Sequence, residues 1–451
     1  MKIALVDLPV VSPPVLTARI QPALWAAYLA VYLQEGIETV FVDGRLGQNT
    51  CWLDELAGPE WRTWGTPLAE LTDQILSHNP DAIGIHVGVS NDIGVAIGLI
   101  RSLRCTFKGR IIIGGSGVAT IPKEFLPKEI ASEEICWVRG IGQGLGLDIT
   151  RPAVSIDELP DRTLLEKYWQ QYIDWDHPHS GPCLLKPSAQ VHTSTGCGGK
   201  CQFCTTRAPL RRRDLDSIRR ELEILRDDYG IVGIQDESDN VLGFSDRQTQ
   251  KVMPYLDLLI EMGFRSFESS NGLTVKGMLN PRFQDWLGRA LEAGMAIRLL
   301  LPFESASEQI LRAMHKPQHH QDCRRLIEQL ASLKGKGALH LEIFLQVGFH
   351  LVEDNKIRME GQESIAATLK WSDELRNMAA MNTWFNIPLP GTPVFPLWRQ
   401  QLPKAPWESL IFSSPSLLYP KDIRTALLGE ILPRNTARRS AAFDPTKSAQ
   451  P

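Results

Sequence analysis

Three cysteines stand close together in the chain, at Cys197, Cys201 and Cys204, in the spacing CxxxCxxC. A structural zinc site normally has four protein ligands, and here no fourth Cys or His follows at pairing distance. Three thiolates suit a 4Fe-4S cluster instead, because three irons would each have a protein ligand and the fourth would stay open to a substrate or cofactor. An open iron indicates chemistry rather than simple electron storage.

The residues around these cysteines fit a cluster-binding loop. Gly196, Gly198 and Gly199 let the backbone wrap a cluster closely, and Phe203 can shield it from water. The alternative is that the three cysteines are merely neighbours on an ordinary loop. The strand signal before the loop and the helix signal after it favour the cluster.

The composition of the whole chain limits what kind of protein this is. Its 451 residues, formal net charge of -4 and 43% hydrophobic residues predict two or three domains with sizeable cores. No apolar run approaches the roughly 20 residues that cross a bilayer, and the first residues resemble a strand rather than a signal peptide, so we expect a cytoplasmic protein without a membrane span. Eight cysteines are too few for a disulfide scaffold. The near-neutral charge offers no general polyanion-binding surface, so we do not expect nucleic acid as a partner, and the basic run 211–213 favours a solvated approach to a helix.

Residues 1–150 alternate short apolar runs with helical patterns, which is typical of parallel strands joined by crossover helices. The predicted strands are 3–8, 39–43, 82–86, 110–113 and 135–138, and the predicted helices include 22–35 and 92–104. An open α/β sheet of this kind binds ligands at the carboxyl ends of its strands. Glycines at two successive strand ends would let a planar ligand approach the backbone. The residues at these ends are Leu8, Pro9, Val89, Ser90, Gly114, Gly115, Arg139, Gly140 and Gly142.

The rest of the chain predicts a second α/β domain. Residues 151–187 are rich in proline and aromatic residues and predict a packed connector. From 188 to 400 the alternation holds for six rounds, which predicts a six-stranded partial (β/α) barrel with its site at the strand C-termini. Its predicted strands are 190–193, 232–235, 266–270, 296–301, 339–346 and 383–387. Residues 401–451 form a C-terminal extension, whose tail we expect to be disordered from about Pro433.

Polar residues gather where the strands of the second domain end. Asp236, Ser269, Glu304 and Ser305 are candidates for binding a ligand there. Charged and hydroxyl residues after a strand also cap the following helix, and this alternative stays open for Asp239, Asp246, Ser305 and Ser307.

The CxxxCxxC loop after a first strand resembles the radical S-adenosylmethionine (SAM) superfamily. In that superfamily the open iron chelates SAM, and one electron splits SAM to a 5'-deoxyadenosyl radical. Three further motifs resemble its cobalamin-dependent branch, in which a Rossmann-like cobalamin-binding domain precedes the radical SAM domain. They are Gly114-Gly115 with Arg139-Gly140-Ile141-Gly142, the turn Glu304-Ser305-Ala306-Ser307, and Pro388-Leu389-Pro390-Gly391-Thr392-Pro393. The resemblance covers about residues 1–400.

The resemblance assigns roles to the residues named above. Cys197, Cys201 and Cys204 would hold the 4Fe-4S cluster, and Phe203, Asp236, Ser269, Glu304 and Ser305 would bind SAM. The residues at the strand ends of the first domain would bind cobalamin, and the proline-flanked turn at 388–393 would hold a barrel wall against adenine. No Asp-x-His-x-x-Gly element is present, which implies cobalamin with its base detached and no histidine on cobalt; His86 is the alternative ligand.

The function that the resemblance implies is an enzyme that moves a methyl group from methylcobalamin to an unreactive carbon after hydrogen abstraction. Its substrate would be a small molecule or a peptide, and its electron donor a flavodoxin- or ferredoxin-like protein. A radical methylthiotransferase is an alternative, but it needs a second cluster, which the scattered Cys51, Cys105 and Cys136 do not suggest. Another radical rearrangement or cyclisation, and a cobalamin-binding protein without catalysis, are further alternatives. No motif indicates a catalytic side chain.

Overall fold

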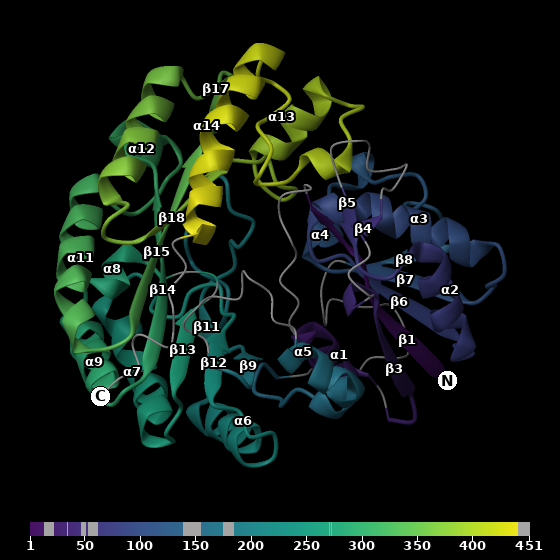
Figure 1. The fold of residues 1–451 in the computed structure, drawn as a ribbon. Helices are drawn as coiled ribbons and strands as arrows, with labels where there is room; N and C mark the ends of the chain where they lie inside the picture. Colours follow the sequence, from purple (N-terminus) through teal and green to yellow (C-terminus); the bar gives the residue numbers. More distant parts are fainter. Residues whose placement is uncertain are drawn as a thin grey trace. The chain divides into compact units, whose positions relative to one another are not determined.

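The computed structural model describes residues 1–12, 22–33, 35–46, 51–52, 62–138, 155–174, 185–269, 271 and 273–440. The chain divides into two compact units (Figure 1). The first unit comprises Met1–His177 and Pro388–Ile411, and the second comprises Pro178–Ile387 and Phe412–Pro451. The units therefore do not follow the chain in simple order, because a segment late in the sequence packs with the N-terminal sheet.

The first unit is built on a parallel sheet with the strand order β3-β1-β6-β7-β8. Its strands are β1 (Lys2–Asp7), β3 (Glu38–Asp43), β6 (Ala82–His86), β7 (Arg110–Gly114) and β8 (Ile135–Trp137). Beside it lies a small antiparallel sheet of β2 (Val10–Ser12), β5 (Arg62–Trp64) and β4 (Cys51–Trp52). The helices of this unit are α1 (Leu24–Tyr32), α2 (Leu68–Ser77), α3 (Ile93–Arg104), α4 (Ser116–Ala119), α5 (Trp169–Asp174) and α13 (Val394–Gln401), with 3-10 turns at Gly44–Leu46, Ser90–Asp92, Lys123–Phe125, Arg162–Tyr168 and Trp407–Ser409.

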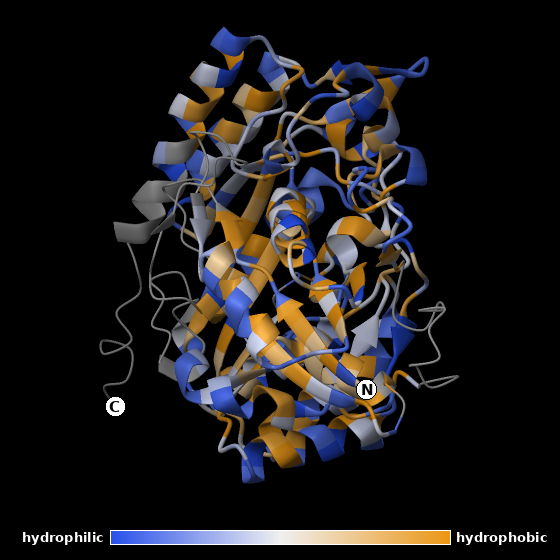
Figure 2. Ribbon diagram, turned by 90° about the vertical axis from the view of Figure 1, so that its right-hand side faces the viewer, coloured by the Kyte–Doolittle hydropathy of each residue, from blue (hydrophilic) through white to orange (hydrophobic). Residues whose placement is uncertain are grey.

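The central strands of this sheet are apolar on both faces. Ile83, Ile85, Ile111 and Ile113 point to one face and Ala82 and Ile112 to the other, and all six are buried, as expected for parallel strands covered on each side by helices. The strands near the N-terminus are accordingly mostly hydrophobic in Figure 2. The strands predicted for residues 1–138 are confirmed to within one or two residues at each end.

The proline-flanked turn at 388–393 packs within the first unit. The Thr120 hydroxyl donates a hydrogen bond to the carbonyl of Pro390 at 2.9 Å. Gly391 has φ +86°, and a Cβ added there would lie 2.8 Å from Cβ of Thr120, so only glycine fits this contact. In the described structure the turn packs within the N-terminal unit, and its role in holding a wall of the barrel stays a prediction.

The second unit is a six-stranded parallel sheet with the order β18-β15-β14-β13-β12-β9. Its strands are β9 (Ser188–Val191), β12 (Gly233–Asp236), β13 (Ser266–Ser269), β14 (Ala296–Glu304), β15 (Leu339–Val347) and β18 (Ala380–Phe385). Helices cover one face of the sheet (Figure 1). They include α6 (Leu215–Asp227), α7 (Asp246–Glu261), α8 (Val275–Met278), α9 (Pro281–Glu292), α10 (Glu308–Ala313), α11 (His320–Leu333), α12 (Gln362–Leu375) and α14 (Lys421–Ser440). The six predicted strands are confirmed.

The two faces of the second sheet differ in character. Phe267 of β13 faces the helices and packs edge-on against Trp286 of α9, with ring centroids 5.8 Å apart. The opposite face carries a buried ion network, in which Arg298 Nη1 lies 2.6 Å from Glu268 Oε1 and Arg298 Nε lies 2.9 Å from Glu342 Oε2. Asn382 also donates to Glu342. Four adjacent strands are thereby tied together across this face.

Other elements differ from the sequence-based prediction. The hairpin of β16 (His350–Glu353) and β17 (Lys356–Met359) was not predicted. Helix α14 continues through Pro433 to Ser440, so the prediction of a tail disordered from about Pro433 was wrong as far as Ser440.

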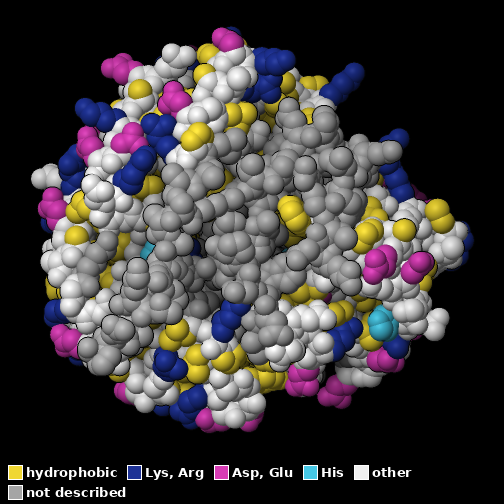
Figure 3. Space-filling model, viewed as in Figure 1, with side chains coloured by type: hydrophobic (Ala, Val, Ile, Leu, Met, Phe, Trp, Pro, Cys, Tyr) yellow, Lys and Arg dark blue, Asp and Glu magenta, His cyan; other side chains and the backbone are white. Residues whose placement is uncertain are grey.

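Within the described ranges, no helix has both the length and the apolar character that crossing a bilayer requires. Basic and acidic side chains are interspersed on the face shown in Figure 3.

Candidate functional site

The three cysteines lie on one loop between β10 (Ser194–Thr195) and β11 (Arg211–Arg212). The N–H groups of Cys197 and Gly198 both donate to the carbonyl of Ala208, each at 3.0 Å, so the loop closes on itself. The N–H of Thr206 donates to Sγ of Cys204 at 3.4 Å. All three thiols are free and partly buried.

The donor set of this loop fits a multi-iron cluster better than a single metal ion. Among the residues that the structure describes, no three His, Cys, Asp or Glu side chains are placed to hold one ion. Burial raises the pKa of Cys201 to about 11 although Lys316 opposes the shift, and burial also raises the pKa of Cys204. Both thiols are thus mostly protonated in the metal-free protein, and bound metal cations would favour their thiolate forms. Three such thiolates leave one iron of a 4Fe-4S cluster without a protein ligand.

Asp239 fastens both ends of the cysteine loop. Its Oδ2 accepts from the N–H of Gly196 at 3.0 Å, and its Oδ1 accepts from the hydroxyl of Thr206 at 3.1 Å. Beside it, Asn240 Nδ2 donates to the carbonyl of Cys197 at 3.4 Å. Helix α7 is capped by Ser245 instead, whose hydroxyl accepts from Gln248 N. The capping alternative for Asp239 was thus wrong, and its role in shaping the loop had no local sequence signal.

The far side of the loop is attached to the end of α10. The N–H of Gln202 donates to the carbonyl of Met314 at 3.0 Å, and Gln202 Nε2 lies 2.9 Å from His315 Nδ1. Lys316 follows directly, and its Nζ lies 5.6 Å from the ring centroid of Phe203. Lys316 is therefore part of the site, although no motif in the sequence indicated it.

Glu304 ends β14 in an unusual backbone conformation. Its φ is +65°, in the left-handed region that residues other than glycine rarely adopt, and such residues cluster at functional sites. Its Oε1 lies 2.8 Å from Nζ of Lys316, and its Oε2 accepts from Gln346 Nε2 at 2.6 Å. The structure thus brings Glu304, Phe203 and the cysteines together through Lys316.

The other residues predicted to bind SAM are enclosed by their own chain. Asp236 is fully buried and accepts hydrogen bonds from the Thr193 hydroxyl at 2.6 Å and from Ser238 N at 2.9 Å. Ser269 is its neighbour across the β12–β13 pair and is also fully buried. The buried hydroxyl of Ser305 accepts from Ser307 N at 3.1 Å, and the Ser307 hydroxyl caps α10. Their part in binding SAM stays a prediction.

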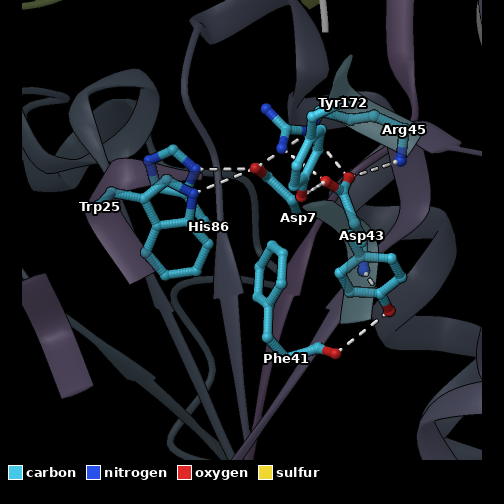
Figure 4. A network of polar contacts seen from close by, with 8 residues as sticks. Asp7, Trp25, Phe41, Asp43, Arg45, His86 and Tyr172 are labelled. Atoms are coloured by element: carbon cyan, nitrogen blue, oxygen red, sulfur yellow. Dashed lines mark hydrogen bonds and ion pairs between the residues drawn. The ribbon is translucent and has the colours of Figure 1, made fainter. Parts of the chain in front are cut away.

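At the carboxyl edge of the first sheet, Asp7 is the centre of a buried polar network (Figure 4). His86 Nδ1 lies 3.1 Å from Asp7 Oδ1, and Trp25 Nε1 donates to Asp7 Oδ2 at 3.1 Å. The imidazole also stacks on the Trp25 indole, with centroids 4.2 Å apart. Burial on its own would raise the pKa of Asp7, but Arg45 and His86 bring it down to about 2.

The same network continues to the end of β3. Arg45 Nε lies 3.2 Å from Asp7 Oδ2, and Arg45 Nη2 lies 2.6 Å from Asp43 Oδ2. The Tyr172 hydroxyl donates to Asp43 Oδ2 at 2.6 Å. These contacts join the ends of β1, β3 and β6 to the segment after residue 155. The network therefore stabilises the edge of the sheet at which a cofactor is expected.

The predicted cobalamin-binding residues have different surroundings. Leu8 is buried, Val89 is 48% exposed, and the Ser90 hydroxyl donates to the carbonyl of Gly117 at 3.1 Å. Pro9 is buried. Arg139, Gly140 and Gly142 lie outside the described residues. A contact of these residues with cobalamin stays a prediction.

The double glycine after β7 is already required by the packing of the protein itself. Gly115 has φ +102°, and a Cβ there would lie 2.4 Å from the carbonyl oxygen of Val87 and 2.7 Å from Cδ2 of His86. A Cβ on Gly114 would lie 2.6 Å from Cγ2 of Val138. The glycines therefore do not by themselves demonstrate an approaching ligand.

Comparison with solved structures identifies the fold. The cobalamin-dependent SAM radical enzyme OxsB with aqua-cobalamin bound superposes with a TM-score of 0.58 at 14% identity, over 85% of this chain and 53% of that chain. The radical SAM methyltransferase TsrM from Kitasatospora setae, with cobalamin and a [4Fe-4S] cluster bound, superposes with a TM-score of 0.56 at 14% identity, over 99% of this chain and 89% of that chain. The predicted fold class, an N-terminal Rossmann-like sheet followed by a six-stranded parallel sheet, is confirmed.

Sequence comparison finds a shorter match. The chain is 28% identical over 167 residues to the cytidylyl-2-hydroxyethylphosphonate methyltransferase of Streptomyces wedmorensis, which covers 35% of this chain and 28% of the relative. The match thus spans about a quarter of that curated relative. No family model matches the chain.

Proposed function

We propose that this chain, which has the fold of the cobalamin-dependent radical SAM enzymes, is itself an enzyme of that kind and transfers a methyl group to an unreactive carbon. The observation that carries the proposal is the meeting of three free, partly buried cysteines on one loop with the Glu304–Lys316 pair. A loop that served only to connect strands would need neither three thiols nor a buried ion pair beside them.

The residues beside the cysteines offer what SAM requires. SAM has a carboxylate, an ammonium group, ribose hydroxyls and a flat adenine. Lys316 supplies a cation for the carboxylate, Glu304 supplies acceptor oxygens for the hydroxyl or ammonium groups, and Phe203 supplies an apolar surface for adenine. Asp239 and Gln202 hold the loop, and the thiols of Cys201 and Cys204 are close enough to Lys316 to affect it electrostatically.

The cofactors would supply chemistry that side chains lack. When bound, the cluster provides one electron to cleave SAM, and cobalamin provides a methyl group that can be delivered to a carbon radical. The methyl of SAM itself is electrophilic and reacts poorly with such a radical. The protein itself would bind the cofactors and the substrate, orient them toward one another, and keep water away from the radicals.

Substrates named for the relatives differ from one another. One structure of TsrM has tryptophan bound as its substrate, and the Streptomyces wedmorensis enzyme is named for a cytidylyl phosphonate. Both are polar small molecules, and a small-molecule substrate is our proposal for this chain. The Arg298 network on the open face of the sheet is already paired with Glu268 and Glu342, so it does not offer a free charge to a substrate.

The proposal is tested on anaerobically reconstituted protein. We expect about four irons per chain, since one cluster has four, a cobalamin absorbance spectrum of the base-off form, and release of 5'-deoxyadenosine from SAM on reduction with dithionite. About eight irons per chain would favour a methylthiotransferase with two clusters. Cobalamin binding without any 5'-deoxyadenosine would favour a cobalamin-binding protein without catalysis.

A further inference from the structure

Beside the cysteine loop, the second unit has a pocket of about 370 Å³ that the proposed SAM site does not use. It is lined by Leu210, Arg212, Arg247, Gln248 and Lys251. Three of the five lining side chains are cations, and none is an acid. The walls of the pocket therefore carry positive charge.

The pocket adjoins the C-terminal end of the cysteine loop, because Leu210 and Arg212 line it. Strand β11, which contains Arg212, pairs with β10 two residues before Cys197. A Cβ built on Gly198 would lie 3.9 Å from the backbone nitrogen of Leu210. A Cβ on Gly199 would lie 3.3 Å from the Phe244 ring, which immediately precedes α7 and its Arg247 and Lys251. One wall of the pocket is thus the segment that ends the cysteine loop and begins β11.

The two exposed cations of the pocket make no ion pair. Across the described ranges, no carboxylate lies within ion-pairing distance of Arg247 or Lys251, and both are exposed. Arg212 is half-buried, and its Nη2 donates to the carbonyl of Gln248 at 3.2 Å while its Nη1 is buried without a hydrogen-bond partner. Burial lowers the pKa of Arg212, and the opposing effect of Asp236 does not overcome it. A charged donor left unsatisfied in this way favours an anionic partner.

The nearby carboxylates are already engaged. Asp239 binds Gly196 and Thr206, Asp214 caps α6, and Asp246 accepts from Asn280 Nδ2 at 3.1 Å. They keep their negative charges, but among the described residues no ion pair joins them to Arg247 or Lys251.

Positive charge also extends beyond the pocket walls. Lys200 and Arg207 on the cysteine loop and Arg211 on β11 are exposed. A single small anion would occupy the pocket but would leave these three cations uncovered. A protein with a carboxylate-rich face would engage both groups at once.

We propose that this basic pocket and the exposed cations of the cluster loop form the docking surface for an acidic, flavodoxin-like electron donor. The inference rests on the proposed function, since it supplies the electron that SAM cleavage needs. In the step that it serves, the reduced flavin of the partner loses one electron and the oxidised cluster gains it, and no covalent bond forms or breaks. The pocket shares no lining residue with the Glu304–Lys316 site, so we expect a donor docked there to leave that site open.

The test compares two double variants with equal changes in charge. Arg247→Glu with Lys251→Glu reverses the exposed cations of the pocket. Lys370→Glu with Lys421→Glu reverses two exposed lysines on α12 and α14, at the opposite end of the sheet. Oxidised flavodoxin is titrated into each reconstituted protein at low ionic strength, and the rate of cluster reduction by reduced flavodoxin is followed by stopped-flow absorbance.

We expect the pocket variant to bind flavodoxin at least about tenfold more weakly than wild type does. Its cluster should also be reduced by flavodoxin at least about tenfold more slowly. The control variant should resemble wild type, and added salt should weaken wild-type binding. With dithionite as reductant, both variants should release 5'-deoxyadenosine at the wild-type rate, because dithionite does not need the docking surface.

Each outcome has a distinct meaning. Equal flavodoxin affinity for the pocket variant and wild type would overturn the docking proposal. It would also be overturned if inorganic phosphate bound the pocket and the variant lost phosphate without losing flavodoxin, because the pocket would then be a small-anion site. Absence of 5'-deoxyadenosine from wild type with dithionite would instead overturn the proposed function, and the flavodoxin titration would still decide the docking surface.

Discussion

Nζ of Lys316 lies 2.8 Å from Oε1 of Glu304, and this ion pair adjoins the cysteine loop. Burial alone would lower the pKa of Lys316, but Glu304 and Cys201 raise it, so the ammonium is retained. The pair is nearly enclosed, with side-chain exposures of 12% for Lys316 and 7% for Glu304. A charge pair of this kind beside three free thiols is best explained by a charged ligand that joins it.

We therefore expect Lys316→Met to weaken SAM binding by about tenfold or more, because a charge-assisted hydrogen bond contributes about 1.5 to 3 kcal/mol. Glu304→Gln should have an effect in the same direction. Iron content should stay at the wild-type level in both variants. Equilibrium binding of SAM to the reconstituted protein measures the effect, and Arg312→Met, an exposed cation on α10, is the matched control. Unchanged SAM affinity would mean that the pair only stabilises the fold.

Cys201→Ala should abolish the visible absorbance of the cluster and the release of 5'-deoxyadenosine while cobalamin stays bound. The reason is that the cysteine loop and the first sheet belong to different units. Cys323→Ala is the control, because this buried thiol on α11 is not part of the loop and should leave the cluster intact. Loss of cobalamin from Cys201→Ala would show that the two units fold interdependently.

Arg298→Met should lower the free energy of unfolding by about 3 to 5 kcal/mol, because it leaves the buried carboxylates of Glu268 and Glu342 without their partner. Arg289→Met is the comparison. Arg289 pairs with Asp257 at 2.7 Å, but its side chain is 48% exposed, so its loss should cost less than about 1 kcal/mol. Chemical unfolding followed by circular dichroism measures both values, and equal effects would contradict the prediction.

Stability of the first unit should depend on pH through Asp92. Burial raises the pKa of Asp92 from its ordinary 3.8 to about 8, and Asp7 and Glu408 add to the rise while Val11 N–H opposes it. Between pH 3.8 and about 8, the Asp92 carboxyl is protonated in the folded protein and ionised in the unfolded chain. The contribution of Asp92 to stability is therefore fully present below pH 3.8 and is lost as the pH rises through about 8.

Asp92→Asn should therefore raise the unfolding free energy by about 1 to 3 kcal/mol at pH 8 and change it little at pH 4, since the amide resembles the protonated carboxyl and removes the burial penalty. Exposed Asp73→Asn should have no comparable effect. Thermal unfolding at several pH values checks this. An Asn variant that is less stable at pH 8 would show that Asp92 is ionised in the folded protein.

We also expect no histidine on the cobalt of bound cobalamin. The His86 imidazole is held by Asp7 through Nδ1 and stacks on Trp25. His86→Phe keeps the stacking and should leave the paramagnetic resonance spectrum of the reduced cobalamin unchanged, without splitting from an axial nitrogen. Nitrogen splitting that is present in wild type and absent from the variant would identify His86 as the cobalt ligand.

Sequence periodicity alone was enough to predict both parallel sheets. Each strand is a short apolar run bounded by turn residues, and these signals are local, so they can be read without knowing what the strands pack against. The cysteine spacing is local in the same sense, because three cysteines on one loop do not depend on the rest of the fold to lie near one another.

Only the tertiary structure decided which other residues join the cysteines and which of the predicted ones are enclosed by their own chain. Lys316 reaches the loop because α10 returns the chain from Glu304 to Gln202, and Asp239 reaches Gly196 because β9 and β12 are neighbours in the sheet. Similarly, the turn at 388–393 contacts Thr120. The space that a side chain would need at Gly114 or Gly115 is occupied by Val138 and Val87. Such contacts join residues far apart in the chain. Their side chains have the same composition and local pattern whether or not they meet, so only packing in three dimensions distinguishes a ligand-binding residue from a structural one.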